Sequence, residues 1–332
     1  MHNRDLPECK CALAGELLQR ILGGMRGKTI AIVGSGSIGL YYGGKLAADG
    51  QDVRFLLRAG YEEAQREGIR IYDKEHGDVT VRDPQVFRTT KEIGPSDLVI
   101  VGVKATANDS LPHLLPPLLH KDTMVLTLQN GLGNEGFLGG HLGAERMLGG
   151  LCFICLTRRT PASVDHVGRG TMSLGEYERP SLPRTRQVVE AFVHAGVETR
   201  LVENLAEERW RKLVWNIPFN GLAVATSGLT TDKILADPAL HAKCRALMAE
   251  VITVANALGH PIEPDYADFQ IKRTLPMGPY KPSTLVDWLA GQELEIEPIW
   301  GEPLRSAQAA GVDVPHLAEL YGKIKAQAHP SA

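Results

Sequence analysis

The sequence predicts an α/β protein with a Rossmann-type, doubly wound parallel sheet domain, followed by a mostly α-helical C-terminal domain. Apolar runs of strand length alternate with helix-length segments up to about residue 200. A glycine-rich loop follows the first of these runs. Later apolar residues recur mainly at helical spacing. We therefore expect an N-terminal extension (1–26), a nucleotide-binding domain (27–201) and a helical domain (202–328).

The elements of the first domain follow from runs of apolar residues. KTIAIVG is continuously apolar apart from its first residues, as expected of a parallel strand covered on both faces. A helix of small residues follows, with Gly50 as its C-terminal stop. The predicted strands are 28–34, 52–57, 97–103 and 123–129, with a hairpin within 68–83 and two further strands within 146–158 and 171–179.

The second domain is predicted from four stretches with helical spacing of apolar residues, within 203–226, 241–260, 283–311 and 315–327. Gly259 and Gly311 stand where helices are expected to stop, and Pro315 where one is expected to start. Open α/β sheets bind ligands at the carboxyl ends of their strands. We therefore expect a cleft between the two domains.

Composition excludes several classes of function. A net charge of −3 in 332 residues gives no basic field to attract nucleic acid or a membrane surface. No apolar run approaches the roughly 18–20 residues that span a bilayer. Residues 1–26 lack the features of a signal peptide and predict a short helix at 12–22.

The five cysteines do not form a disulfide framework, which favours the reducing cytoplasm. Cys152 and Cys155 lie in an apolar run that predicts a buried strand, and a redox or metal role is the alternative. We find neither an HExxH motif nor a spaced Cys/His set, so no metal is predicted.

The glycine-rich loop fits G-x-G-x-x-G and predicts a dinucleotide site. It lies between a predicted strand and a predicted helix, the context that the motif requires. The first glycine permits the turn, the second lets the backbone approach a pyrophosphate, and the third allows close packing. The pyrophosphate would meet the helix N-terminus. A glycine-rich turn without a ligand is the alternative. The expected residues are Gly34, Ser35, Gly36, Ser37, Ile38 and Gly39.

Arg58 stands at the end of the second strand, where an NAD site carries an acidic residue that binds the ribose hydroxyl. A guanidinium instead matches the charge and geometry of a 2′-phosphate. The cofactor is therefore expected to be NADPH. The alternative interpretation of Arg58 is a solvated cation at the strand end.

The stretch RWRKLVWN (209–216) begins a polar stripe on a largely apolar helix. Lys212, Asn216 and Asn220 are spaced at i, i+4 and i+8, within about 80° of the helix circumference. A lysine beside two amides differs from a solvent face of mixed charges, although a surface lysine with hydrogen-bonding asparagines remains the alternative. Arg209 and Arg211 are interpreted as ordinary solvated or packing residues.

Together these motifs resemble the ketopantoate reductase family. The resemblance is carried by the glycine loop at 34–39, VKA at 103–105, QNG at 129–131, WRKLVWN at 210–216 and the late PSTLVD…LEIE, and it extends from about residue 28 to about residue 325. It implies an NADPH-dependent 2-dehydropantoate 2-reductase. A homodimer is the family-level expectation.

The resemblance also assigns roles to individual residues. Lys212 matches the catalytic lysine that protonates the substrate carbonyl, and Glu295 the glutamate that supports catalysis. Arg58 matches the arginine for the 2′-phosphate. Lys104 is expected to line the nicotinamide side, and Asn130 to serve both cofactor and substrate. The residues expected to bind substrate are Asn130, Asn216, Asn220 and Ser283.

The chemistry agrees with these roles, because a lysine ammonium can give a proton to an oxygen that gains charge, and an amide can stabilise that oxygen. Simpler interpretations stay open. Ser283 or Thr284 can cap a helix, with Asp287 completing a T-x-x-D box. Glu295 lies in an acidic cluster that can be solvated, Lys104 can be a surface cation, and the segment Asn130–Gly131 can be a plain turn.

Two departures from the family pattern affect the substrate. Pro298 and Trp300 replace small or polar residues after Glu295, and Thr230 stands where some members have an asparagine. The sequence therefore supports reduction of a 2-keto acid more firmly than ketopantoate itself. The alternatives are a dehydrogenase of similar build for another hydroxy acid or glycerol phosphate, or a non-catalytic NADPH-binding sensor.

Overall fold

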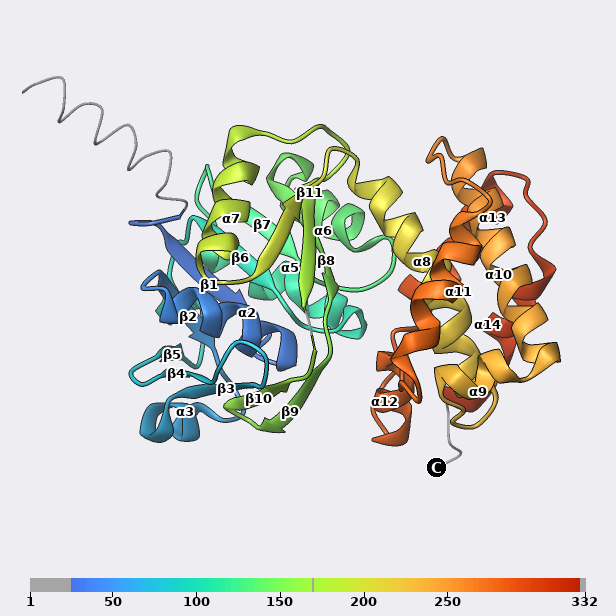
Figure 1. Ribbon diagram of the computed structural model, residues 1–332. Coiled ribbons are helices and arrows are strands. Elements are labelled where there is room, and N and C mark those ends of the chain that lie inside the picture. Colours follow the sequence, from blue (N-terminus) through green and yellow to red (C-terminus); the bar gives the residue numbers. More distant parts are fainter. Residues whose placement is uncertain (1–24, 169, 329–332) are drawn as a thin grey trace, which may run out of the picture.

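The computed structural model describes residues 25–168 and 170–328, which form two parts (Figure 1). Residues up to Leu201 build a sheet flanked by helices, and residues from Leu205 build a cluster of helices. The predicted fold class is confirmed. The helix expected at 12–22 lies outside the described residues. Across the two described ranges, no helix is long and apolar enough to cross a membrane.

The main sheet has eight strands in the order β12-β11-β8-β7-β6-β1-β2-β5. All neighbours are parallel except β8 and β11, which are antiparallel. The order reverses between β1 and β6, and this switch point is where such sheets bind ligands. The strands are β1 Thr29–Val33, β2 Asp52–Leu56, β5 Gln85–Phe87, β6 Leu98–Val101, β7 Met124–Thr127, β8 Met147–Phe153, β11 Thr171–Glu176 and β12 Glu198–Leu201.

Both faces of this sheet are covered, as the continuous apolar runs predicted. In β1, Ile30 and Ile32 point to one face, while Ala31 and Val33 point to the other. Helices α2 (Ser37–Ala48) and α7 (Pro183–His194) pack on the first face. The second face carries α4 (Thr90–Ile93), α5 (Leu111–Leu114) and α6 (Asn134–Leu142).

A second, four-stranded sheet lies against α2, and the sequence did not separate it from the first. Its order is β4-β3-β10-β9, and β3 and β4 form the predicted hairpin. The segment 146–158, predicted as one strand, instead leaves the main sheet after Phe153 and enters the small sheet at Leu156. The strands are β3 Ile69–Asp73, β4 Val79–Val81, β9 Leu156–Thr160 and β10 Ser163–His166; α3 spans Tyr61–Glu67.

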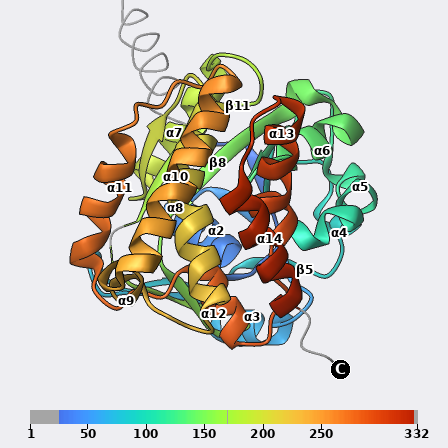
Figure 2. The same ribbon diagram turned by 90° about the vertical axis from the view of Figure 1, so that its right-hand side faces the viewer.

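Helix α8 (Leu205–Ala225) is the centre of the helical part, and α10 and α14 lie beside it (Figure 2). Its apolar residues join one core with Met248 and Trp300. The helix predicted within 203–226 is confirmed. The other helices are α9 Thr231–Ala236, α10 Pro238–Ala257, α11 Tyr266–Thr274, α12 Ser283–Leu289, α13 Glu302–Ala309 and α14 Pro315–Ala328.

Short helical turns complete the described chain. The π-helical turn η5 (Glu297–Gly301) leads directly into α13, and the 3-10 turns are η1 Ala105–Ser110, η2 Pro116–Leu118, η3 Ala144–Arg146 and η4 Leu275–Met277. Gly259 and Gly311 follow α10 and α13 with φ of +82° and +68°, which glycine adopts without strain. Pro315 begins α14 as predicted.

Candidate active site

The glycine-rich loop joins β1 to α2 at the switch point of the sheet. Gly34 has φ of +98°, and a Cβ there would overlap the backbone of Val103, which follows β6. A Cβ on Gly39 would overlap the carbonyl oxygen of Gly34. A Cβ on Gly36 would meet no atom within 4 Å. The first and third glycines are therefore required for packing, and the second leaves the backbone open to a ligand.

Two further features suit this loop to a nucleotide. Helix α2 begins without a side-chain cap, so no capping side chain occupies the N–H groups of its first turn, which in helices generally are suited to bind an anion. The Ser35 hydroxyl donates to the carbonyl of Leu56 at 2.9 Å, which ties the loop to the end of β2. Arg58 follows β2 and is exposed.

Lys212 of α8 reaches across to the sheet. Its Nζ donates to Oδ1 of Asn130 and to the carbonyl of Cys152, both at 2.9 Å. It also lies 5.3 Å from the ring centre of Phe153, within the range of a cation–π contact. Asn130 follows β7, and Cys152 and Phe153 end β8. Lys212 is thus held by groups from the carboxyl ends of two strands.

The surroundings of Lys212 change its protonation. Burial lowers the pKa of Lys212 to about 8, and the neighbouring charge of Arg209 acts in the same direction. The carboxylate of Glu295 opposes this effect. Because the pKa lies near neutrality, Lys212 can give up and regain a proton at ordinary pH.

Glu295 connects the helical part to two loops of the sheet part. Its Oε1 accepts a hydrogen bond from the backbone N–H of Ala105 at 2.8 Å, and its Oε2 one from the Asn130 amide at 3.4 Å. Burial raises the pKa of Glu295, while these hydrogen bonds oppose the rise. The residue is 9% exposed, so the interpretation as a solvated acidic cluster is wrong.

Lys104, like Glu295, contacts the opposite part of the molecule. Its Nζ forms an ion pair with Asp287 at 2.9 Å and donates to the carbonyl of Glu293 at 3.3 Å. Both partners belong to the helical part, so Lys104 connects the two parts rather than standing free at a strand end.

The other two members of the polar stripe, Asn216 and Asn220, follow Lys212 along α8. Asn216 and Asn220 are both buried. Oδ1 of Asn220 accepts the backbone N–H of Thr284 at 3.0 Å and lies 3.5 Å from the Ser283 hydroxyl. The amide of Asn220 therefore satisfies the start of α12. The alternative of a T-x-x-D capping box at Thr284 is wrong, because α12 has no side-chain cap of its own.

Comparisons with known proteins match these features over nearly the whole described chain. Residues 30–179 match the family described as "Ketopantoate reductase PanE/ApbA", and residues 204–328 match its C-terminal counterpart. The chain is also 37% identical over 306 residues to a 2-dehydropantoate 2-reductase of Nostoc sp., covering 91% of this chain and 95% of that one. The chain belongs to the ketopantoate reductase family. It is accordingly a nicotinamide-dependent oxidoreductase of that family.

Solved structures agree with the family. A 2-dehydropantoate 2-reductase from Geobacter metallireducens GS-15 is 41% identical, with a TM-score of 0.87 over 90% of this chain and 99% of that one. A ternary structure of D-mandelate dehydrogenase with NADH and anilino(oxo)acetate has a TM-score of 0.81 over 90% of this chain and 97% of that one. At 21% identity the latter likeness shows the fold alone.

In this ketopantoate reductase, the environment of Arg209 differs from the one that the sequence predicted. Arg209 was expected to be an ordinary solvated or packing residue, but it is 5% exposed and forms an ion pair with the buried Glu135. The signal lay in the helix period, since a residue three positions before Lys212 lies on a neighbouring face. The partner 74 residues away in the chain was not visible from spacing. Arg211, by contrast, pairs with Glu207 one turn earlier on the same helix.

The departures from the family pattern have defined places. Trp300 is fully buried in the helical core and donates from Nε1 to the carbonyl of Ile217 at 3.1 Å. The carbonyl of Pro298 accepts the N–H of Leu132 at 2.8 Å. Thr230 precedes α9, and its hydroxyl contacts Asp232. These residues thus support helices and the loop after β7.

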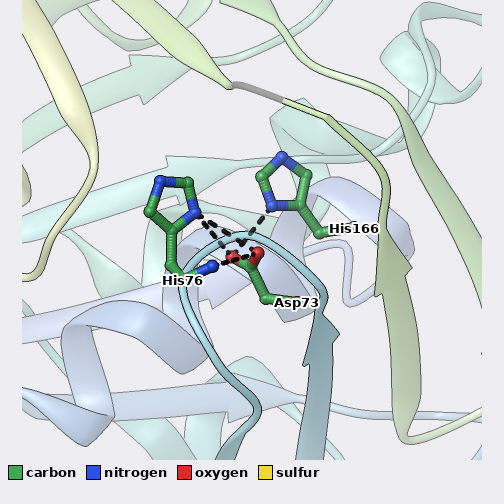
Figure 3. A group of neighbouring side chains, drawn as sticks. All are labelled: Asp73, His76 and His166. Carbon is green, nitrogen blue, oxygen red and sulfur yellow. Dashed lines mark hydrogen bonds and ion pairs between the residues drawn. The ribbon is translucent and has the colours of Figure 1, made fainter.

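Sequence analysis missed a group of titratable side chains in the small sheet, shown in Figure 3. Asp73 and His166 are partners in the β3–β10 register, and Nδ1 of His166 lies 2.9 Å from the Asp73 carboxylate. His76 lies in the turn that follows β3, and its Nδ1 is 3.2 Å from Oδ2 of Asp73. These groups are of types that bind metals, but the hydrogen bonds among them already account for the arrangement.

The charge of Asp73 follows from the same contacts. Burial acts to raise its pKa, but hydrogen bonds from His166 and from the backbone N–H groups of His76 and Glu75 outweigh it and lower the pKa to about 2. The carboxylate is therefore ionised at neutral pH and holds the hairpin turn.

Cys152 and Cys155 are free thiols in this fold, and Cys155 lies beyond the end of β8 rather than in the predicted strand. Burial raises the pKa of both thiols. A neutral thiol is a weak nucleophile and a poor metal ligand. The backbone of Cys152 contributes to the site through its carbonyl, which accepts from Lys212.

Proposed function

We propose that this family member reduces 2-dehydropantoate, or a closely related 2-keto acid, with NADPH as the hydride donor and Lys212 as the proton donor. The observation that carries the proposal is the ammonium of Lys212, held between Asn130 and the carbonyl of Cys152 at 2.9 Å from each. Both contacts lie at the carboxyl ends of strands, beside the switch point that carries the glycine loop.

The protein's part in the reaction is to supply a proton and to stabilise charge. The bound nicotinamide supplies the hydride that the carbonyl carbon of the substrate receives. As negative charge develops on the carbonyl oxygen, Lys212 gives its proton to that oxygen and becomes a neutral amine. A pKa of about 8 suits this transfer, since the donor is protonated at neutral pH without holding its proton too tightly. The Asn130 amide orients the ammonium.

Glu295 is proposed to support Lys212 through Asn130. Its carboxylate contacts the Asn130 amide at 3.4 Å and also holds the N–H of Ala105. A charge at this place also opposes the loss of the Lys212 proton, because it raises the pKa of that lysine. Lys104 is proposed to lie along the nicotinamide side, next to η1.

Substrate binding is proposed for Asn130, Asn216, Asn220 and Ser283. Asn216 and Asn220 continue the stripe of Lys212 and are buried, and Ser283 lies 3.5 Å from Asn220. Donors of this kind match the carboxylate and hydroxyl groups of a 2-keto acid. We also propose that 27–201 and 202–328 are separate domains, and that the protein acts as a cytoplasmic homodimer.

Cofactor choice is proposed to depend on Arg58. It follows β2 and is exposed, so its guanidinium is free to meet a ligand, and the loop residue Ser35 contacts the same strand end. The glycine-loop residues 34–39 are proposed to hold the pyrophosphate, with Gly36 as the point of closest approach.

The test is a steady-state assay of the purified protein with NADPH or NADH against ketopantoate and a panel of other 2-keto acids. We expect ketopantoate and NADPH to give the highest kcat/KM. A clear preference for another keto acid would keep the chemistry and change the substrate. Tight NADPH binding with no oxidation by any keto acid would contradict the proposal and favour a sensor.

A further inference from the structure

We propose that the buried ion pair of Arg209 and Glu135 is a positioning device that sets Asn130 against Lys212. The proposal rests on the proposed function, because it assumes that Lys212 is the proton donor. It concerns two residues that do not touch Lys212 by hydrogen bonds and that the family resemblance did not single out.

The guanidinium of Arg209 donates hydrogen bonds to the loop on both sides of Asn130. Its Nη1 donates to the carbonyl of Gln129 at 3.1 Å and to the carbonyl of Gly131 at 3.2 Å. Its Nη2 pairs with the carboxylate of Glu135. The two carbonyls flank Asn130 in the chain, so the conformation of that residue is fixed from both neighbours.

The loop is also held by Pro298, in the turn η5 of the helical part. Gly131 has φ of +80°, and a Cβ there would overlap the backbone carbonyl of Pro298. The N–H of Leu132 donates to the same carbonyl at 2.8 Å. The segment 129–132 is therefore in contact with both Arg209 and Pro298, which leaves it little freedom to shift.

Space for the ion pair is built into β8. A Cβ on Gly149 would overlap Oε1 of Glu135 and approach Nη2 of Arg209 to 3.1 Å. Glu135 itself is 3% exposed and belongs to the first turn of α6, where a carboxylate is also favoured by the helix N-terminus. A small residue at this strand position is thus required for the pair to form.

Positioning explains this pair better than stability does. Buried ion pairs can often be replaced by apolar residues without loss of stability, because removing two charges from water is costly. What an apolar pair cannot reproduce is a guanidinium fork that donates from Nη1 to two carbonyls and from Nη2 to a carboxylate at the same time. Arg209 and Lys212 are three residues apart on α8, so one helix carries both the proton donor and the group that places its partner Asn130.

The test compares three variants with the wild-type protein. Arg209→Met combined with Glu135→Gln removes both charges and leaves no unpaired buried ion, and Arg209→Lys keeps the charge without the fork. Arg211→Met is the matched control, because it removes a partly exposed arginine of the same helix that pairs with Glu207. We measure kcat, KM for ketopantoate, NADPH affinity by fluorescence, and hydrogen exchange at the Leu132 amide.

Misplacing a catalytic group by about 1 Å costs on the order of a hundredfold in rate. We expect the double variant and Arg209→Lys to lose about tenfold to a hundredfold in kcat and to raise KM for ketopantoate. NADPH affinity should fall less than kcat, because the glycine loop and Arg58 are untouched. The Leu132 amide should exchange faster in both variants. Arg211→Met should match the wild type in all four measurements.

A purely structural role would lower the active fraction alone, leaving KM and the Leu132 exchange rate of the folded protein unchanged, and that result overturns the proposal. Wild-type kcat in a folded Arg209 variant overturns it equally. If the double variant does not fold, Arg209→Lys decides. If the wild type reduces no keto acid, the proposed function fails, while faster exchange at Leu132 still shows that Arg209 positions the loop.

Discussion

The ammonium of Lys212 is fixed by its neighbours, and its pKa is lowered so that it can release a proton near neutral pH. The ammonium has two acceptors within 2.9 Å, and the ring of Phe153 lies beside it. Burial lowers its pKa to about 8, since the charged form is less well solvated there. An ordinary surface lysine would hold its proton far more tightly at neutral pH.

The pKa of Lys212 predicts the pH dependence of reduction. The protonated form is the donor, so kcat/KM for keto-acid reduction should be highest below pH 8 and fall as the pH rises through about 8. Pre-steady-state rates at pH 6 to 10 with saturating NADPH would show this fall, the alkaline limb of the pH profile. In Lys212→Arg the group no longer titrates in this range, so the limb should vanish. An unchanged limb in that variant would assign it to another residue.

Arg58 predicts cofactor preference at the same scale. Arg58→Ala should raise KM for NADPH about tenfold or more while changing KM for NADH little, because a bidentate pair with the 2′-phosphate is lost. Arg245→Ala is the matched control, since this arginine pairs with Asp268 on the surface of the helical part. Equal effects on both cofactors would contradict a phosphate-specific role.

Single residues differed in how far the sequence revealed them. Lys212 and its two asparagines were visible because one helix carries all three at a fixed spacing. The role of Arg209 was not visible, because its partners, a loop carbonyl and a carboxylate at the start of α6, lie 74 to 80 residues away in the chain. The burial of Glu295 was likewise not visible, because tertiary contacts set it. The acidic residues near it in the sequence suggested a solvated segment instead.

Among the structural elements, the loop after β7 depends on a glycine. Gly131→Ala should destabilise the protein by about 2 kcal/mol or more, because the new methyl meets the Pro298 carbonyl and the backbone has positive φ. Gly140→Ala in α6 is the control, since a Cβ there meets nothing within 4 Å and alanine favours a helix. Thermal unfolding of both variants tests this. Equal midpoints would contradict the account.

The same scale shows where sequence patterns suffice. Strand β1, the glycine loop and α2 were predicted because local rules agree there: an apolar run, a tight turn and a helix start. The small sheet was missed because β3 and β10 are paired across some 90 residues of sequence. Hydrophobic periodicity reports which residues are buried, but it does not report which strand is the neighbour.

For the whole molecule, the main feature is a set of contacts that connect the sheet part to the helical part around one site. Glu295 holds Ala105 and Asn130, Lys104 pairs with Asp287, and Arg209 pairs with Glu135. The fold class and the family were predictable from ordered motifs along the chain. These cross-contacts were not, because they depend on how two separately predicted parts pack.

The most direct test of the central claim is the turnover of Lys212→Ala with NADPH and ketopantoate, measured beside NADPH binding. We predict a fall in kcat of about 10² to 10⁴-fold, the usual contribution of a positioned proton donor. NADPH affinity should stay within about twofold, since the glycine loop is untouched. Lys233→Ala, an exposed lysine of α9, serves as the control. Unchanged turnover in Lys212→Ala, with Lys233→Ala also unchanged, would contradict the assignment of Lys212 as the proton donor.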